Sequence, residues 1–339
     1  MPNLTIHSAG PGLTVQDLGR PGWKAQGLST GGAADQLALL EGAALLGVTP
    51  TGAAIEMMGF GGTFSVDEGM RIALTGAVMQ ADIDGDAIPP NATHFLPADA
   101  KLTIRGVQKG VYGYLRLAGG IATDPIMDSR STHLTAGIGR RLQTGDTLPL
   151  GPDPDRMRAP RRLPPADRFS GGAIRIMPGP QTDFFSPATQ DAFSAIVFHR
   201  SPSGNRQGIR LDHDGSCFGT SGGLSNVSDL IVPGDIQITG EGVPYVLLAE
   251  CQTIGGYPRI GSVIPADLPK IAQAGPGTQF QFKFLTVAEA DATAISQAAT
   301  LRALTKMCQP MIRDPHDIAD LLRYQLISGA TPGDDLERP

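Results

Sequence analysis

The stretch Glu250–Gly277, ECQTIGGYPRIGSVIPADLPKIAQAGPG, is the most informative part of the chain. It is polar and rich in glycine, yet it lies between two strand-like runs, Val246–Ala249 and Thr278–Leu285. In the second run, phenylalanines alternate with polar residues at the period of a half-buried strand. A long loop inside a compact domain is usually either functional or disordered. We expect an ordered site loop, because the stretch has apolar anchors at Ile254, Ile260, Val263, Ile264, Leu268 and Ile271.

The length and composition predict a mainly β protein with two domains. At 339 residues the chain exceeds the usual size of one hydrophobic core. Its 44 glycines and 28 prolines separate short alternating apolar runs, which is typical of many short strands. The run GPDPDRMRAPRRLPP has no periodicity and predicts a linker over 151–168. We therefore expect domains at 1–150 and 169–287, followed by a helical tail at 288–339.

A few elements can be placed more closely. A helix is expected over Ala34–Leu46, with Gly47 as its C′ residue. The pair Asp84-Gly85 predicts a hairpin. The expected tail helices are Ala288–Met307 and His316–Leu326, and their leucines are expected to pack on the β-domains. The expected strands are Leu4–Ile6, Leu13–Val15, Ala54–Met58, Thr63–Val66, Arg71–Thr75, Val78–Ile83, Leu102–Val107, Tyr112–Leu117, Ile174–Met177, Ile196–His199, Ile236–Ile238 and Tyr245–Ala249.

Charge and cysteine usage narrow the class of protein. The formal net charge of −6 and the pI of about 5.5 argue against a nucleic-acid-binding surface. No apolar run is long enough to span a bilayer, and the start MPNLTIHSAG lacks the features of a signal peptide. Cys217, Cys251 and Cys308 are odd in number and form no CxxC motif. We therefore expect a cytoplasmic protein without a membrane or nucleic-acid partner.

A weak internal repeat relates the two halves of the chain. At a constant offset of 132 residues, Gly110 matches Gly242, Val111 matches Val243, Leu115 matches Leu247 and Gly145 matches Gly277. Each half would then place a glycine-rich loop between two strands, at Ala118–Gly145 and at Glu250–Gly277. Chance matches of common residues are the alternative to duplication. Duplication would give two related β-domains, each closing its sheet to remove edges.

Four polar, glycine-containing loops each carry a candidate arginine. The loops are Gln16–Asp35, Ser129–Arg141, Ser201–Leu211 and Glu250–Asp267, and the arginines are Arg20, Arg130, Arg206 and Arg259. A guanidinium in such a loop can bind a carboxylate or phosphate in a planar fork, helped by backbone N–H groups. For each arginine alone, bonding to loop carbonyls is the alternative. The four together predict at least one anion contact.

Two carboxylates of the opening stretch are candidate catalytic groups. Glu250 follows the apolar run YVLLA at the end of an expected strand. Burial there would raise its pKa and suit it to proton transfer, whereas a solvated carboxylate is the alternative. Asp267 precedes Leu-Pro and could N-cap the turn Leu268–Gln273, with a catalytic role as the alternative.

Neutral side chains of the same stretch could bind an amide. Gln252, Thr253 and Tyr257 supply donors and acceptors that would orient such a group. Cys251 has no suitably placed histidine and is not expected to act as a nucleophile. No metal site is expected, because His213 and its two aspartate neighbours cannot converge on one ion without a tight loop.

Several motifs are absent from the sequence. It contains no GxxxxGK[ST], no strand–GxGxxG–helix unit and no HExxH. It also has no Met-Lys pair that resembles a biotin attachment site. His133 and His199 could act as bases, but each is isolated and is expected to be structural.

Six stretches resemble a known family. They are TVQDLGRPGW (Thr14–Trp23), IALTGA (Ile72–Ala77), YLRLAGGI (Tyr114–Ile121), DSRST (Asp128–Thr132), GNRQGIRL (Gly204–Leu211) and QTIGGYPRIGSVIPADLPKIAQAGPG (Gln252–Gly277). In this order they are similar to the biotin-dependent carboxyltransferase family, whose members are also called allophanate hydrolase subunit 2, KipA-like proteins or the C subunit of 5-oxoprolinase. The resemblance runs from about residue 4 to residue 286. It implies two cyclophilin-like β-barrel domains and a partner, the KipI-like or allophanate hydrolase subunit 1 protein.

Two departures from the family pattern concern the candidate site. The family often has Ser/Asp-Arg-Met-Gly where this chain has Asn205, Arg206, Gln207 and Gly208, so the arginine is kept. The family often has Asp where Glu250 stands, so the carboxylate is kept. The first departure weakens the transfer of substrate detail from any one member.

The resemblance implies, first, a subunit of an ATP-dependent amidohydrolase of 5-oxoprolinase type, which opens 5-oxoproline to glutamate with partner subunits. In that interpretation Arg206, Glu250 and Asp267 are catalytic, and ATP is used in the complex. The substrate would be a small amide, and the expected substrate-binding residues are Asn205, Gln252, Thr253, Tyr257, Arg259, Arg20 and Arg130.

Two other functions are open from the sequence. One is carboxyl transfer from carboxybiotin, held on a separate carrier, to urea or a related amide. The other is a non-catalytic regulator that binds its partner subunit.

Overall fold

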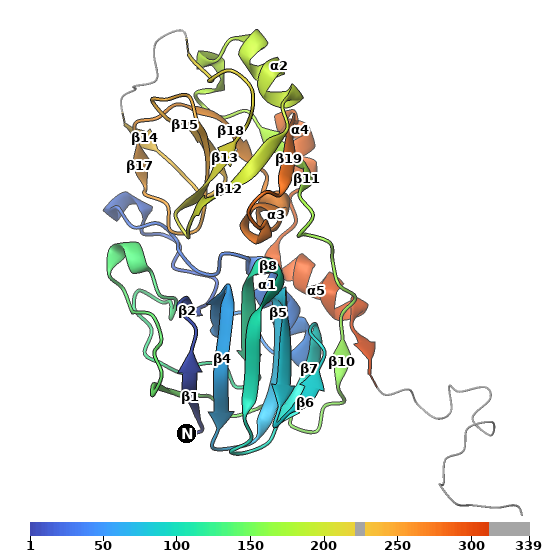
Figure 1. Ribbon diagram of the computed structural model, residues 1–339. Coiled ribbons are helices and arrows are strands. Elements are labelled where there is room, and N and C mark those ends of the chain that lie inside the picture. The colour runs from blue at the N-terminus through green and yellow to red at the C-terminus, as the bar shows by residue number, and fades with distance from the viewer. Residues whose placement is uncertain (221–227, 312–339) are drawn as a thin grey trace, which may run out of the picture.

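The computed structural model describes residues 1–220 and 228–311, and they form two β-units, one above the other in Figure 1. The first unit is an 11-stranded sheet, and the second is a closed barrel. Helices are few and short. The mainly β class predicted from the sequence is therefore confirmed.

The first unit contains most of the longer strands. Its elements are β1 (Asn3–Ala9), β2 (Leu13–Gln16), η1 (Lys24–Gln26), α1 (Gln36–Leu46), β3 (Ala54–Met58), β4 (Phe60–Val66), β5 (Met70–Ile83), β6 (Asp86–Ile88), β7 (Ala92–Leu96), β8 (Leu102–Leu117), η2 (Leu134–Ala136) and β9 (Thr147–Pro149). The main path of its sheet is β20-β10-β7-β5-β8-β4-β1-β9, and it draws two short strands from the linker and the tail.

Strands β5 and β8 are each longer than the sequence predicts. Each joins two expected strands, because Gly76 and Gly110 do not turn the chain. They have φ of 81° and 98° inside continuous strands, and the β5–β8 register shifts beside Gly76. A glycine at positive φ in a strand accommodates a bulge as readily as a turn. The expected hairpin at Asp84-Gly85 is confirmed between β5 and β6.

The second unit is the barrel. Its elements are β11 (Gly172–Met177), η3 (Thr182–Phe184), α2 (Pro187–Ala195), β12 (Phe198–Gly204), β13 (Gly208–Asp212), β14 (Asp229–Leu230), β15 (Asp235–Ile238), β16 (Pro244–Leu247), β17 (Ile254–Gly255), β18 (Arg259–Val263), η4 (Pro265–Asp267), α3 (Leu268–Gln273) and β19 (Gln279–Phe284).

The barrel ring is β11-β18-β15-β16-β13-β12-β19. Alternation in β19 buries Phe280 and Phe282, as predicted, and Phe282 meets the rings of Phe193 and Phe198. Within the described residues, strand pairing closes a ring in this unit, whereas the first unit is an open, branched sheet.

The stretch Glu250–Gly277 is ordered, but it is not one long loop. It contains β18, which pairs with both β11 and β15 in the barrel, and the helix α3. The sequence RIGSV of β18 does not reveal this strand, because Arg259, Gly261 and Ser262 interrupt its apolar pattern. Of the expected anchors, Ile260 and Ile271 are fully buried, whereas Ile254 is exposed.

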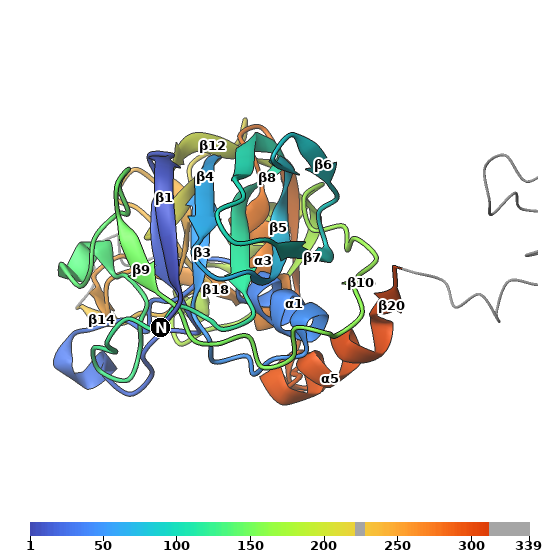
Figure 2. The ribbon, with the colours of Figure 1, turned by 90° about the horizontal axis from the view of Figure 1, so that it is seen from below.

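The tail returns to the first unit. It comprises α4 (Val287–Ala292), α5 (Gln297–Met307) and β20 (Gln309–Pro310), so the expected single helix is broken before Ser296, the N-cap of α5. Helix α5 lies beside α1 in both views (Figures 1 and 2), and Leu304 is buried with Leu40 and Leu45. The expected packing of the tail on the β-units therefore holds here. The expected helix His316–Leu326 lies outside the described residues.

The segment between the units, which is the expected linker 151–168, is hydrogen-bonded to the first unit. Within it, β10 (Arg161–Arg162) pairs with both β7 and β20. Asp153 forms a bidentate ion pair with Arg71 of β5. Composition predicts a linker here, but it cannot show that this segment carries an edge strand. Among residues 1–220 and 228–311, no helix has the length and apolar character to cross a membrane.

Candidate interunit site

Arg206 joins the two units at a buried ionic cluster. Its Nε donates to Glu250 Oε1 at 2.6 Å, and its Nη1 donates to Glu56 Oε1. Its Nη2 donates to the carbonyl of Gly32. All three guanidinium nitrogens are therefore used, and Arg206 is only 7 % exposed. Arg206 and Glu250 belong to the barrel unit, whereas Glu56 and Gly32 belong to the first unit.

Local backbone structure brings Arg206 and Glu250 together. Arg206 lies in the turn between β12 and β13, where Asn205 Oδ1 accepts a hydrogen bond from Gln207 N at 2.7 Å. Such an Asx turn fixes the backbone without a regular hairpin ladder. Glu250 N donates to the carbonyl of Arg206 at 2.8 Å, and Leu248 N donates to that of Gln207. The end of β16 thus lies against the turn, and the two charged side chains face one another.

Glu56 supplies the carboxylate of the first unit. It lies in β3 and is 1 % exposed. Besides Arg206, its Oε2 accepts from Tyr114 Oη at 2.7 Å and from Ala34 N at 2.9 Å. Tyr114 Oη in turn accepts from Asp35 N at 2.8 Å. Both oxygens of this buried carboxylate are therefore bonded, as burial of a charge requires.

Glu250 is held as a carboxylate. Its Oε2 accepts from the backbone N and the hydroxyl of Thr135, each at 3.2 Å. Burial alone would raise the pKa of Glu250, but the Arg206 guanidinium, these bonds and nearby His133 together lower the pKa below its ordinary value. The expected raised pKa of Glu250 is therefore wrong. The sequence did not show that Arg206 is the partner of this carboxylate.

His133 is buried next to Glu250. Its Nδ1 accepts from Ala136 N at 3.2 Å, so Nε2 carries the proton and donates to Ser29 Oγ at 2.8 Å. Burial lowers the pKa of His133, which favours this neutral form. Nδ1 lies 3.9 Å from Glu250 Oε2. His133 is a buried residue that connects loops of the first unit to the site.

A cavity of about 170 Å³ opens at this cluster. Its buried wall includes Glu56, Arg206 and Glu250, and its exposed rim includes Arg141 and Gln207. The other lining residues are Gly12, Thr14, Met58, Leu134, Thr135 and Asn205. Two buried carboxylates, one guanidinium that already donates from each of its nitrogens, and several neutral polar groups suit a small polar molecule better than a polyphosphate.

A second polar contact fixes the units to each other. Gln273 of α3 accepts at Oε1 from the backbone N of Val111 and of Tyr112, at 2.9 and 3.0 Å. Its Nε2 donates to Tyr112 O and to Asp35 Oδ2, each at 2.8 Å. Asp35 also pairs with Arg168 of the linker at 2.9 Å. Gln273 thus bonds to β8 as a neighbouring strand would.

Arg20 and Arg130 hold loops of the first unit. Arg20 Nη2 donates to the carbonyl of Ser131, and Arg130 Nε donates to that of Thr123 at 2.6 Å. Asp17 accepts from the backbone N of Arg130 and from the hydroxyl of Ser129. Neither arginine lines the interunit cavity.

The other candidates of the opening stretch lie away from the cluster. Arg259 is buried and pairs with Asp229 and Asp235, while Gln181 accepts from its Nε. Gln252 and Tyr257 are exposed, and Thr253 is buried and accepts at its carbonyl from Ile231 N. None of these four candidates lines the interunit cavity.

Asp267 is bonded within the barrel unit. It begins α3 but makes no side-chain cap. Its carboxylate accepts from Arg175 N, Nε and Nη2 at 2.7 to 2.9 Å. Burial alone would raise its pKa, but these bonds to Arg175 lower it. The predicted cap interaction is therefore replaced by an ion pair, and Asp267 lies outside the cluster.

Glu56 was missed by reasoning from the sequence. Its signal is a lone carboxylate in the otherwise apolar strand AAIEMM, which is costly unless a partner is buried with it. Thr135 and Gln273 gave weaker signals, because neutral polar residues are common in loops and short helices.

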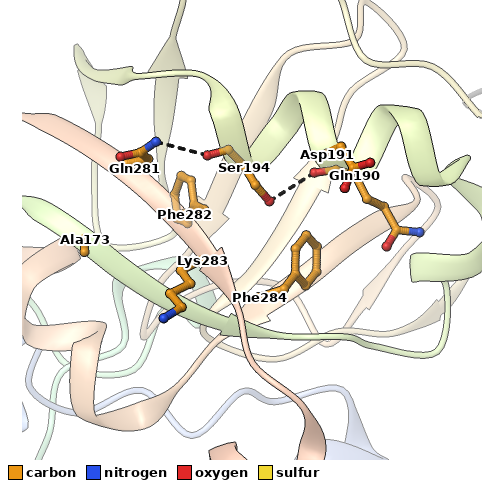
Figure 3. A pocket seen from close by; sticks show the side chains of 8 residues that line it. All are labelled: Ala173, Gln190, Asp191, Ser194, Gln281, Phe282, Lys283 and Phe284. Carbon is orange, nitrogen blue, oxygen red and sulfur yellow. Dashed lines mark hydrogen bonds between the residues drawn. The ribbon is translucent and has the colours of Figure 1, made fainter.

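A hollow larger than the interunit cavity lies elsewhere and has different chemistry. It lies on the outer face of the barrel, between α2 and β19 (Figure 3). Gln281 Nε2 crosses it to the carbonyl of Ser194 at 3.3 Å, and Lys283 and Asp191 lie at its sides. It has no buried ionic group. The interunit cavity is therefore the better candidate for chemistry.

Fold and site together define a class: a mainly β protein of two units whose interface buries an arginine between two carboxylates. The chain belongs to the carboxyltransferase-domain family, since the model of "Carboxyltransferase domain, subdomain A and B" matches residues 26–284.

Curated relatives have two kinds of name. The chain is 36 % identical over 294 residues to the 5-oxoprolinase C subunit of Escherichia coli (strain K12), and the match covers 85 % of this chain and 93 % of that protein. It is 31 % identical over 304 residues to the 5-oxoprolinase C subunit of Haemophilus influenzae, covering 88 % and 94 %. Urea amidolyase of Saccharomyces cerevisiae is 26 % identical over 254 residues, which are 69 % of this chain and 14 % of that protein.

Solved structures share the arrangement. TTHA0988 has a TM-score of 0.76 and 29 % identity, and the match covers 84 % of this chain and 56 % of that chain. The Kluyveromyces lactis urea amidolyase shares the fold, with a TM-score of 0.78 at 22 % identity over 92 % of this chain and 21 % of that one. This chain therefore spans about half of the first structure and about a fifth of the second.

Proposed function

We propose that the chain is a subunit of an ATP-dependent 5-oxoprolinase, which opens the cyclic amide 5-oxoproline to glutamate. The observation that carries the proposal is the 36 % identity to the Escherichia coli 5-oxoprolinase C subunit over 93 % of that protein. The interunit cavity supports it, because its size and mixed polar lining suit a small amide.

In this proposal Glu250 acts as the hydrogen-bond and proton acceptor at the amide. Its lowered pKa keeps it ionised at neutral pH, which an acceptor requires. Arg206 holds Glu250 and Glu56 in place, since all three of its nitrogens are already bonded. Thr135 and Gln207 at the rim supply neutral groups that could orient the amide.

The cavity does not fit the phosphates of ATP. Two of its buried side chains are carboxylates, and each nitrogen of the buried guanidinium between them already donates to a protein oxygen. A polyphosphate is bound by several free donors or by a glycine-rich cradle. We therefore assign ATP binding to another part of the complex and derive no step through it.

The proposal requires partners. The names of both bacterial relatives designate one subunit of a larger enzyme. We infer that this chain also works with a KipI-like subunit and a further 5-oxoprolinase subunit, in the cytoplasm. We also propose that the two β-units are related cyclophilin-like domains, with boundaries at 1–150 and 169–287.

A second candidate is carboxyl transfer from carboxybiotin, on a separate carrier, to urea. The family description and the urea amidolyase relatives favour it. It differs from the first proposal in substrate charge and in its need for a biotin carrier. Binding of the partner without turnover of either substrate would instead support a regulatory protein.

The test is reconstitution of the complex. The chain is copurified with its partner subunits, and glutamate formation from 5-oxoproline with ATP is compared with carboxylation of urea by a biotinylated carrier. Glu250→Gln is expected to lower 5-oxoproline turnover by about 10²–10⁴-fold. Arg210→Ala is the matched control, because Arg210 pairs with Asp212 on the exposed side of β13. Undiminished turnover with Glu250→Gln would remove the assigned role.

A further inference from the structure

We propose that Arg141 binds the carboxylate of the substrate and thereby selects an anionic amide over a neutral one. This inference rests on the proposed function, because 5-oxoproline carries a carboxylate and urea does not. Arg141 lies at the exposed rim of the interunit cavity and is not among the arginines that the sequence singles out.

Of the two arginines that line the cavity, Arg141 is the one whose side chain can bind a ligand. Glu56 and Glu250 are buried in its wall and share Arg206. Each nitrogen of the buried Arg206 guanidinium already donates to a protein oxygen, and two of these oxygens belong to Glu56 and Glu250. Arg141 is the other cationic residue that lines the cavity. Its side chain makes no hydrogen bond or ion pair with any residue in 1–220 or 228–311.

The backbone on the C-terminal side of Arg141 is held in place, which limits the positions that the Arg141 side chain can reach. Leu142 is buried, and its N–H donates to the carbonyl of Leu13 at 2.9 Å. This bond holds the Arg141 segment beside Gly12 and Thr14, which line the same cavity. The neighbouring Arg140 differs, because it forms a bidentate ion pair with Asp146.

The arrangement gives the substrate one orientation. A substrate carboxylate placed at the buried wall would lie next to the carboxylates of Glu56 and Glu250. Like charges repel more strongly in a buried site than in water. With its carboxylate on Arg141, the substrate directs its neutral amide towards Glu250. The volume of about 170 Å³ is below the 300–1,000 Å³ typical of drug-sized ligands, which fits a single small ring.

The test measures binding of two ligands to the chain assembled with its partner subunits. The ligands are 5-oxoproline and its neutral carboxamide, and the variants are Arg141→Ala, Arg141→Lys and Arg140→Ala. A charge-assisted hydrogen bond is worth about tenfold or more in affinity. Arg141→Ala is expected to lower the ratio of 5-oxoproline to carboxamide affinity about 10- to 100-fold. Arg141→Lys should lower it less, and Arg140→Ala should leave it unchanged.

The outcomes separate this inference from the proposed function. If the wild-type complex binds and turns over 5-oxoproline but Arg141→Ala keeps the wild-type ratio, Arg141 is not the carboxylate-binding residue, while the proposed function stands. An equal loss for both ligands also overturns the inference, because it indicates a structural effect. If the wild-type complex neither binds nor turns over 5-oxoproline, the proposed function fails and the inference fails with it.

Discussion

Arg206 is buried because every polar group near it is paired. Removing a guanidinium from water is costly, and good geometry with two carboxylates and a carbonyl offsets that cost. A planar guanidinium can bond three partners in fixed directions, whereas an ammonium is a single point charge. The shape of the side chain therefore matters as much as its charge.

Arg206→Lys is consequently expected to be disruptive. A lysine has a shorter reach and one nitrogen, so at least one of Glu56 Oε1, Glu250 Oε1 and the Gly32 carbonyl loses its partner. A buried group left unbonded costs about 1–3 kcal/mol of unfolding free energy. Urea denaturation measures the loss, with Arg210→Lys as the control at an exposed pair. Equal stability of Arg206→Lys and wild type would contradict the structural role given to the guanidinium.

Glu250 predicts a pH dependence of stability. Its pKa in the folded protein is lowered, so the ionised carboxylate stabilises the fold above the ordinary value of 4.5. This contribution is lost as the pH falls through the lowered pKa. The difference in unfolding free energy between wild type and Glu250→Gln should therefore be larger near pH 7 than near pH 3. A difference that stays constant over this range would show that Glu250 is not stabilised as an anion.

The sequence shows which residues are charged but not which are paired. Arg206 and Glu250 could be chosen because both lie in polar, glycine-containing loops. Arg259 and Asp267 have the same local signals, yet they pair with Asp235 and Arg175 inside the barrel unit. Only tertiary structure separates these pairs, since their partners are distant in sequence.

Gln273 of helix α3 makes a polar contact between the two units. Gln273 makes four hydrogen bonds with β8 and Asp35, and it is fully buried. Gly110 allows this approach, because a Cβ there would lie 2.9 Å from Gln273 Oε1. The helix begins near its expected start, but its function as a contact between units depends on Gln273, which has no distinctive sequence signal.

Gln273→Ala should therefore weaken the contact between the units. It leaves the backbone N–H groups of Val111 and Tyr112 and the Tyr112 carbonyl without their partner. We expect a loss of about 2–3 kcal/mol in unfolding free energy. Faster amide hydrogen exchange at Val111 and Tyr112 should accompany it. Gln281→Ala is the control, since Gln281 is exposed on the barrel and bonds only to Ser194. Unchanged exchange at these two amides would refute the contact.

Some strands can be predicted from their local sequence pattern, whereas others depend on tertiary contacts. Short apolar runs predicted β3 and β4, and alternation predicted β19. Strand β18 was missed because its polar residues Arg259 and Ser262 are paired with residues distant in sequence, including Asp235 of β15. Likewise, β10 and β20 are two residues each and form only by pairing with one another and with β7. Sequence patterns find strands that bury one apolar face and miss those defined by their neighbours.

Across the molecule, one chain of polar contacts links the cavity to the linker. It runs from Arg206 to Glu56, then through Tyr114 to Asp35, which bonds Gln273 and Arg168. Burial raises the pKa of Tyr114 well above its ordinary value, so its hydroxyl remains a donor. The two units and the linker therefore meet in a single network, and Tyr114 is its midpoint.

A double-mutant cycle tests whether this network is cooperative. Tyr114→Phe removes the bond to Glu56 and leaves Asp35 N unpaired, while Gln273→Ala removes the bond to Asp35 Oδ2. Residues in one network couple by about 0.5–3 kcal/mol, whereas distant sites add within about 0.5 kcal/mol. We expect coupling in that range for the unfolding free energies of the two variants. Tyr114→Phe combined with Arg105→Ala should instead be additive, because the exposed Arg105 side chain pairs with Asp82 outside this network. Additivity in both cycles would mean that the interface consists of independent contacts.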